Sequence, residues 1–171
     1  MSTVDKSRES LRKKSNIDVF SNKVSNILDD LTLSQKERQQ ALRKVYYEEA
    51  VRYRENAKKY LENTKVNNNG YYEDKKYIRT ACGVAYSGLL IALDCYLILK
   101  GVEVIERTKK DIHFYRANLN KQNRKLGDNL DNAYDILHRW GYYDGIGDSV
   151  IVKRGFKELD MFIELINPNK S

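Results

Sequence analysis

The sequence predicts an all-α protein, an antiparallel up-and-down four-helix bundle with an additional helix at its N-terminus. Three observations support this prediction. The 171 residues include one proline, Pro168, and nine glycines, so few residues interrupt a helix. Apolar residues recur every three or four positions along most of the chain. The sequence has no run of alternating apolar and polar residues bounded by a tight turn, which would be typical of a strand. A chain of this length also forms one domain that buries roughly 70% of its unfolded surface.

The N-terminal residues differ in composition from the rest of the chain. Residues 1–14 carry five basic and two acidic side chains and no apolar run, which predicts a disordered basic tail. Residues 15–171 are then a single helical-bundle domain. Because the tail lacks the apolar stretch of a signal peptide, and because the chain has only two cysteines, we expect a cytoplasmic protein.

Two helices are expected in the first third of the domain. The first spans about residues 15–31 and has one apolar stripe: Phe20, Val24, Ile27 and Leu31. The second spans about residues 34–64 and begins at a capping box, in which Ser34 and Glu37 each satisfy a free backbone amide. Its inward-facing residues are expected to be Leu42, Tyr46, Ala50, Tyr53, Ala57 and Tyr60 or Leu61.

The third expected helix, at about residues 72–100, is the most apolar. Two stripes predict burial on most sides and hence a central position: Ile78, Ala81, Ala85, Gly88 or Leu89, Ala92, Cys95 and Leu99, and beside them Val84, Ile91 and Ile98. Residues 81–99 are long enough to cross a membrane, but Asp94 lies inside them, and an intramembrane carboxylate is costly. We therefore expect no membrane span, with Asp94 exposed or paired with an arginine.

Two further helices complete the prediction. The fourth is expected to run unbroken from about Thr108 to Trp140 and to end at Gly141, and the fifth begins near Asp148 or Ser149. The connections are short, so successive helices should be antiparallel neighbours.

Positive charge is concentrated in residues 107–125, which carry seven basic side chains and one acidic side chain. Such a segment can bind a phosphate backbone, and it is equally consistent with a solvated charged face. The candidate nucleic-acid-binding residues are Lys109, Lys110, Arg116, Lys121, Arg124 and Lys125.

Several chemistries have no signature in this sequence. The two histidines, His113 and His138, lie too far apart along one expected helix to share a metal ion. No phosphate-binding Gly-x-x-x-x-Gly-Lys sequence is present. We therefore expect no metal site and no cofactor.

The central helix resembles a known family. The segment from Ala85 to Gly101, AYSGLLIALDCYLILKG, is similar to the second helix of HEPN (higher eukaryotes and prokaryotes nucleotide-binding) domains, and EEAVRYRENAKKYLENT before it is similar to their first helix. The resemblance covers about residues 40–166. It implies a four-helix bundle, usually a homodimer, that is an RNA-cleaving enzyme, a partner of a nucleotidyltransferase-like protein, or a non-catalytic binding module.

The catalytic motif of that family is not intact. Ribonuclease members have an arginine followed four to six residues later by a histidine, whereas here Arg139 is followed by Tyr143 and Asp144, and His138 precedes it. Histidine exchanges protons near neutral pH, which neither replacement does well. These four residues are weak catalytic candidates. The alternative is that Trp140 and Tyr142 close the core, while Arg139 pairs with a helix C-terminus.

We therefore expect a non-enzymatic HEPN-like module that binds RNA, nucleotide or a protein partner. Two alternatives remain: a metal-independent ribonuclease with a displaced site near Arg139, and a purely structural protein–protein interaction module.

Overall fold

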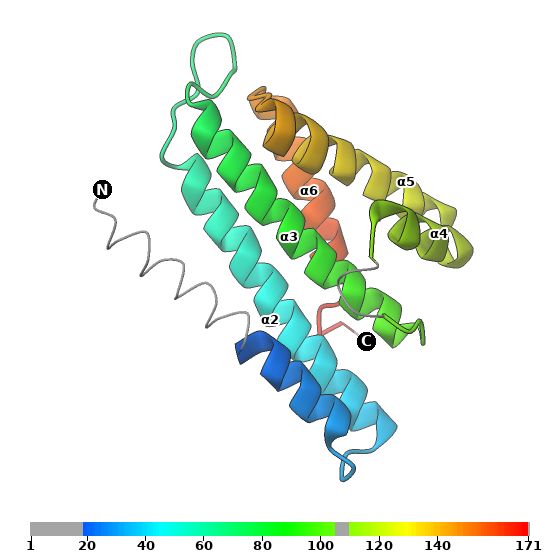
Figure 1. The fold of residues 1–171 in the computed structure, drawn as a ribbon. Helices are drawn as coiled ribbons and strands as arrows, with labels where there is room; N and C mark the ends of the chain where they lie inside the picture. Colours follow the sequence, from blue (N-terminus) through cyan, green and yellow to red (C-terminus); the bar gives the residue numbers. More distant parts are fainter. Residues whose placement is uncertain (1–18, 105–109, 171) are drawn as a thin grey trace.

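The protein is all-helical. The computed structural model describes residues 19–104 and 110–170, and the predicted tail 1–14 lies outside them (Figure 1). The helices are residues 19–29, α2 (Gln35–Leu61), α3 (Lys75–Leu99), α4 (Ile112–Gln122), α5 (Arg124–Ala133), the π-helix η2 (Tyr134–Asp144) and α6 (Ser149–Leu165). In the described part of the chain, β pairing is limited to two isolated bridges at one end of the helices.

Helices α2 and α3 run antiparallel, side by side (Figure 1). The predicted capping box opens α2: the Ser34 amide donates to the Glu37 carboxylate at 2.9 Å, and the Glu37 amide donates to the Ser34 hydroxyl at 3.3 Å. The helix ends at Leu61, three residues before the predicted end. A Cβ on Gly88 would lie 2.9 Å from the Tyr53 Cβ, so this glycine allows α3 to approach α2 closely.

Helix α3 is central, as its two stripes predict. It contacts α2, η2, α6 and α4, and its buried residues include Ile78, Leu89, Leu93 and Leu97. It is long and apolar enough to cross a membrane by length and composition, a property shared by core helices of soluble proteins. Both cysteines, Cys82 and Cys95, are buried and unpaired in it.

The helix at residues 19–29 packs on α2 through one edge. The Phe20 ring meets the Tyr46 ring edge to face, with centroids 5.1 Å apart. Leu31 was expected to extend this apolar stripe, and that prediction is wrong. The helix stops before Leu31, whose side chain is 93% exposed.

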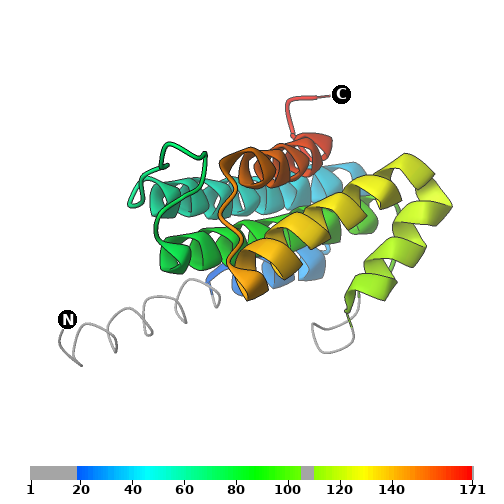
Figure 2. The same ribbon diagram turned by 90° about the horizontal axis from the view of Figure 1, so that it is seen from above.

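The predicted unbroken helix 108–140 is also wrong, because Asn123 divides it into α4 and α5. Its backbone is extended (φ −164°, ψ 114°), and its side chain caps α5 by accepting a hydrogen bond from the Lys125 amide at 2.9 Å. Figure 2 shows the sharp elbow between the two helices. Within it, Asn120 packs against Gly127, where a Cβ would overlap the Asn120 amide.

Beyond α5 the chain continues as η2, past the predicted end at Gly141. Gly141 is buried against Cys82 of α3. The helix ends instead at Gly145, which has the left-handed conformation (φ 67°) that glycine adopts without strain. Helix α6 follows and begins at Ser149, as predicted. The Asp148 carboxylate caps it by accepting hydrogen bonds from the Val150 and Ile151 amides.

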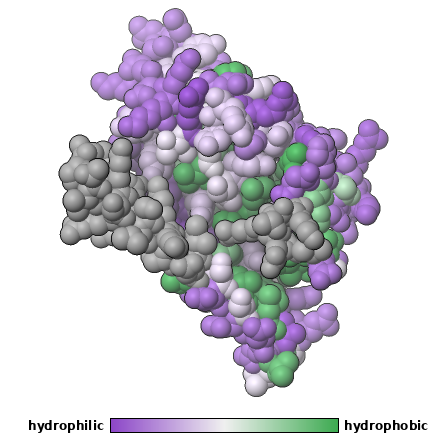
Figure 3. Space-filling model, viewed as in Figure 1, coloured by the Kyte–Doolittle hydropathy of each residue, from purple (hydrophilic) through white to green (hydrophobic). Residues whose placement is uncertain are grey.

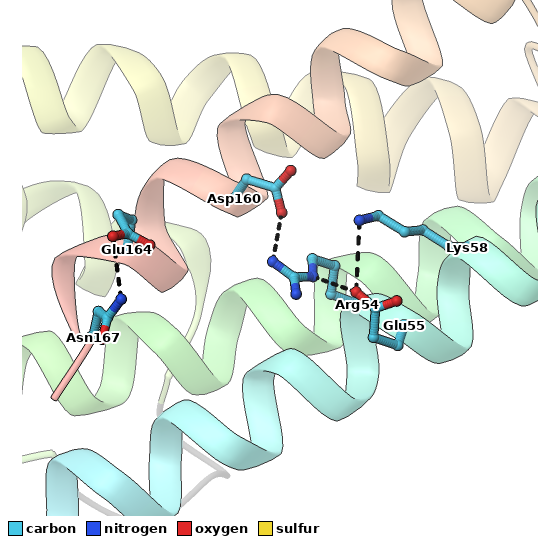
Figure 4. A network of polar contacts seen from close by, with 6 residues as sticks. All are labelled: Arg54, Glu55, Lys58, Asp160, Glu164 and Asn167. Carbon is cyan, nitrogen blue, oxygen red and sulfur yellow. Dashed lines mark hydrogen bonds and ion pairs between the residues drawn. The ribbon is translucent and has the colours of Figure 1, made fainter. Parts of the chain in front are cut away.

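Polar contacts link the outer faces of α2 and α6. Arg54 binds Asp160 across the two helices at 3.2 Å, and Glu55 and Lys58 extend the network along α2 (Figure 4). Such exposed pairs add little stability each, so the apolar core dominates. On the face in Figure 3, apolar residues gather toward the centre and the lower end, and hydrophilic residues surround them.

Candidate functional site

An open groove lies between the N-terminal half of α3 and η2. Its volume is about 440 Å³. We call it the aromatic groove, and its lining residues are Arg79, Thr80, Gly83, Val84, Tyr86, Ser87, His138 and Tyr142. The α3 residues recur at helical spacing on the side of that helix that faces η2, so the sequence itself places them in one row.

Gly83 sets the shape of the groove. A Cβ at this position would lie 2.8 Å from a ring carbon of Tyr142. The absence of a side chain therefore lets the Tyr142 ring rest directly on α3. Tyr142 nevertheless remains 45% exposed, so its ring presents a face to solvent.

His138 lies at the centre of a cluster of tyrosine rings. It stacks on Tyr86 of α3 at a centroid distance of 4.4 Å. Within η2 its centroid lies 5.1 Å from Tyr134, 6.0 Å from Tyr142 and 5.0 Å from Tyr143. Two helices, α3 and η2, thus contribute rings to one aromatic cluster.

The π-helical winding explains how His138 meets both Tyr142 and Tyr143. In an α-helix, residues five apart point about 140° away from each other. A π-helix forms hydrogen bonds between residues five apart, so its wider turn brings Tyr143 back to the same side. The contact between His138 and Tyr143 therefore depends on the π-helical winding.

Burial shifts the pKa of two rings in the groove, His138 and Tyr86. It lowers the pKa of His138 from its usual value, so the imidazole is uncharged at neutral pH. Burial, helped by the nearby Tyr134, raises the pKa of Tyr86 to about 12. These two rings consequently present uncharged aromatic surface at neutral pH.

Arg79 is the one cationic residue among those that line the groove. Its side chain passes over Gly145, where a Cβ would lie 2.9 Å from Nε. Among the described residues it has no carboxylate partner. By contrast, Arg116 lies 5.3 Å from the Tyr134 ring and pairs with Asp131, so its charge is already neutralised.

The weak catalytic candidates are divided by the structure. His138 lies in the groove, whereas Arg139 is exposed and binds Asp135, one turn earlier, at 2.9 Å. Tyr143 is 62% exposed, and Asp144 ends η2 on the surface. Trp140, expected to close the core in the alternative role, is 36% exposed.

The predicted basic segment does not form one continuous surface. Lys109 lies outside the described residues. Lys121, Arg124 and Lys125, which we call the elbow cations, are exposed at the junction of α4 and α5. Helix α5 runs from Arg124 to Ala133, so Lys125 lies about 13 Å along the helix axis from the start of η2.

Lys110 has a structural partner instead. Its ammonium lies 2.6 Å from one oxygen of Asp94, and the Tyr115 hydroxyl donates to the other oxygen at 2.7 Å. The Lys110 and Asp94 side chains are only 10% and 18% exposed. Asp94 is therefore paired with a lysine and a tyrosine rather than with an arginine, and the three residues pin α4 to α3.

Sequence reasoning missed most of the groove. Arg79 and Tyr86 were not predicted as site residues, because the sequence does not reveal that α3 packs against η2. One local signal was available: Tyr134, His138 and Tyr142 are spaced four residues apart, which places aromatic rings in one row of a helix. For metals, the described residues contain no group of three or more His, Cys, Asp or Glu side chains that could hold an ion.

Comparison with known proteins places the groove within a shared domain. A family model described as "Domain of unknown function (DUF5618)" matches residues 45–168, which include both walls of the groove. A protein of unknown function from Dyadobacter fermentans is 35% identical, with a TM-score of 0.62, over 72% of this chain and 94% of its own. No curated protein matches.

Proposed function

The chain belongs to the DUF5618 family, and we propose that this member is a non-enzymatic module that binds single-stranded RNA or nucleotide in the aromatic groove. The observation that carries the proposal is the cluster of aromatic rings around His138 beside the guanidinium of Arg79, which has no carboxylate partner among the described residues. In this proposal α2, α3, the α5–η2 helix and α6 are the core of a HEPN-like, up-and-down four-helix bundle.

The ring stack supports nucleobase binding for an energetic reason. Every nucleobase has a flat π-face, and stacking on an aromatic side chain contributes about 1–3 kcal/mol per base in single-stranded complexes. Tyr142 supplies an exposed ring, and Tyr86 and His138 hold that ring wall in place behind it. Neutral rings suit this contact because no charge must be desolvated.

Charge supports the nucleic-acid part of the proposal. The chain has a net charge of +7, which attracts a polyanion at a distance. Arg79 offers a guanidinium that no neighbouring carboxylate among the described residues occupies, and guanidinium binds phosphate oxygens in a bidentate manner. The groove thus combines a stacking surface with one phosphate ligand.

The test is the fluorescence anisotropy of a labelled single-stranded RNA, titrated with protein from low to physiological salt. We expect binding that weakens with salt. Arg79→Gln and Tyr142→Leu should each weaken it about tenfold, as expected for the loss of one charged or stacking contact. The matched controls are Arg154→Gln on α6 and Tyr71→Leu, both exposed residues outside the groove, and these should bind RNA like the wild type.

The elbow cations are the alternative RNA-binding site to the aromatic groove. If neutralising Lys121, Arg124 and Lys125 abolishes binding while the groove variants bind normally, the groove proposal is wrong. If RNA does not bind even at low salt, a protein-partner module becomes the better explanation for this chain.

A ribonuclease is the second candidate, favoured by one specific observation. His138, the residue before Arg139, is held neutral in a solvent-accessible groove and so can accept a proton at neutral pH. This candidate predicts RNA cleavage in EDTA that Arg139→Ala and His138→Ala each abolish. Intact RNA after prolonged incubation with folded protein would rule it out.

A further inference from the structure

A further cation lies beside the aromatic groove, outside its lining. Lys75 is the first residue of α3, four residues before Arg79. Residues four apart on a helix are neighbours on one face, with Cβ atoms about 5–6 Å apart. The row that contributes Arg79 to the groove therefore reaches a second positive charge at the N-terminus of α3.

Gly145, directly after the last residue of η2, lies against both side chains. A Cβ placed on it would lie 2.9 Å from Arg79 Nε, 3.5 Å from Arg79 Cγ and 3.5 Å from Lys75 Cβ. The backbone after η2 thus touches the stems of both residues, and glycine permits this because its φ is 67°. This contact places the two cations together, at the end of η2 and hence at one end of the groove.

Both charges are available to a ligand. Lys75 and Arg79 are exposed, and neither has a carboxylate partner among the described residues. Asp144, at the end of η2, forms no ion pair with either of them. By contrast, Arg116 and Arg139 each bind an aspartate. The ligand contacts open beside the groove are therefore a guanidinium and an ammonium on neighbouring turns of α3.

Two neighbouring cations suit two successive phosphates of one strand. The guanidinium of arginine binds one phosphate in a bidentate manner, and the ammonium of lysine binds the next as a point charge on a flexible stem. A mononucleotide has a single phosphate group, so it would leave Lys75 without a contact. In a nucleoside diphosphate the two phosphorus atoms share one bridging oxygen, which holds them closer together than the stems of residues four apart on a helix.

We infer that Arg79 and Lys75 bind two successive phosphates of a single-stranded RNA, whose backbone follows α3 from the groove toward the N-terminus of that helix while a base lies on Tyr142. This inference rests on the proposed function. It adds Lys75 as a phosphate-binding residue and selects a strand, rather than a free nucleotide, as the ligand.

The experiment is isothermal titration calorimetry of the full chain with UpU, pUpU and UpUp at constant ionic strength. The three ligands have the same two bases, and the last two add a second phosphate at one end or the other. At least one of these two should bind about tenfold more tightly than UpU, as expected for one further charged hydrogen bond. UMP and UDP form the parallel pair for a diphosphate, and the gain from UMP to UDP should be smaller.

Substitutions of Lys75 test its charge. Lys75→Gln should reduce the tenfold advantage to about twofold or less, whereas Lys75→Arg should keep it because the charge remains. Lys157→Gln, which changes an exposed lysine on α6, is the matched control and should also keep it. With a longer single-stranded RNA, Lys75→Gln should reduce the slope of log affinity against log salt by about 0.7, the value for one phosphate contact. Urea unfolding should show wild-type stability for Lys75→Gln, since this side chain is exposed.

The outcomes separate this inference from the proposed function. Equal affinities for UpU, pUpU and UpUp, an advantage that persists in Lys75→Gln, or an equal gain from UMP to UDP would overturn the inference. The absence of binding by all these short ligands would overturn it as well. In each case, RNA binding that Arg79→Gln and Tyr142→Leu weaken in the anisotropy assay would leave the proposed function intact.

Discussion

Gly141 lies at a close contact between η2 and α3 in the core. A Cβ placed there would lie 2.4 Å from Cys82 Sγ, 2.6 Å from Cys82 Cβ and 2.9 Å from the Ile136 carbonyl oxygen. Ordinary contacts of a Cβ are 3.4–4 Å. Gly141→Ala therefore requires α3 and η2 to separate locally by roughly 1 Å, because Cys82 is fully buried and cannot move aside.

The cost of this separation can be bounded. Overpacking a close-packed core costs about 1–3 kcal/mol, and three short contacts, one of them to backbone, place Gly141→Ala at the upper end. Replacing glycine by alanine within a helix returns up to about 1 kcal/mol of backbone propensity. The net loss in the free energy of unfolding should be about 2 kcal/mol, which lowers the Tm of a chain of this size by about 4–8 °C.

Urea unfolding followed by circular dichroism would measure the loss. The matched comparison is Gly83→Ala, whose Cβ would meet only the Tyr142 ring, a half-exposed side chain that can swing away. That variant should retain wild-type stability within about 0.5 kcal/mol, since the propensity gain offsets a small displacement. The double variant Cys82→Gly/Gly141→Ala should recover part of the loss through a favourable coupling energy. Wild-type stability in Gly141→Ala would refute the close approach of α3 and η2.

Three further predictions follow from the same contacts. Gly83→Ala should weaken RNA binding several-fold in the anisotropy assay despite its normal stability, because the added Cβ displaces the Tyr142 ring. Unchanged affinity would show that the Tyr142 ring does not contribute to RNA binding. Lys110→Met should lower the free energy of unfolding by about 2 kcal/mol, since it leaves the Asp94 carboxylate half-buried without its cation. In urea unfolding, the double variant Lys110→Met/Asp94→Asn should regain part of the lost stability. Burial raises the pKa of Cys82 and Cys95 from 9.0 to about 12. Both thiols therefore stabilise the fold below pH 9, and this contribution is lost as the pH rises from 9 toward 12. The Tm of a double cysteine-to-alanine variant should therefore fall less steeply above pH 9 than the Tm of the wild type.

Local signals in the sequence account for most of the helical elements. The Ser34–Glu37 capping box, the two stripes of α3 and the start of α6 near Asp148 or Ser149 were each predicted from neighbouring residues alone, and the structure confirms all three. Capping and periodicity are short-range effects, so one sequence is enough to recognise them.

The errors arise where tertiary packing decides between locally acceptable structures. Apolar residues keep a helical period across Asn123, so the pattern favours one helix, whereas the Asn120–Gly127 contact stabilises a bend. The π-helical winding of η2 departs from the assumed period of 3.6, and for that reason the meeting of His138 with Tyr143 could not be predicted. Likewise His138 was named from a motif, but its partner Tyr86 comes from another helix.

The pin formed by Asp94, Lys110 and Tyr115 has a consequence for local unfolding. Helix α4 has 11 residues, of which only Tyr115 and Leu119 are buried, and a helix this short is marginal on its own in water. Its amide protons should therefore exchange together, at a lower free energy of opening than those of α3, and proteases should cut within α4 before they cut within α3. Because Lys121 lies on the same helix, detachment of α4 would carry part of the exposed positive charge away from the core. The aromatic groove, which α4 does not line, would stay intact.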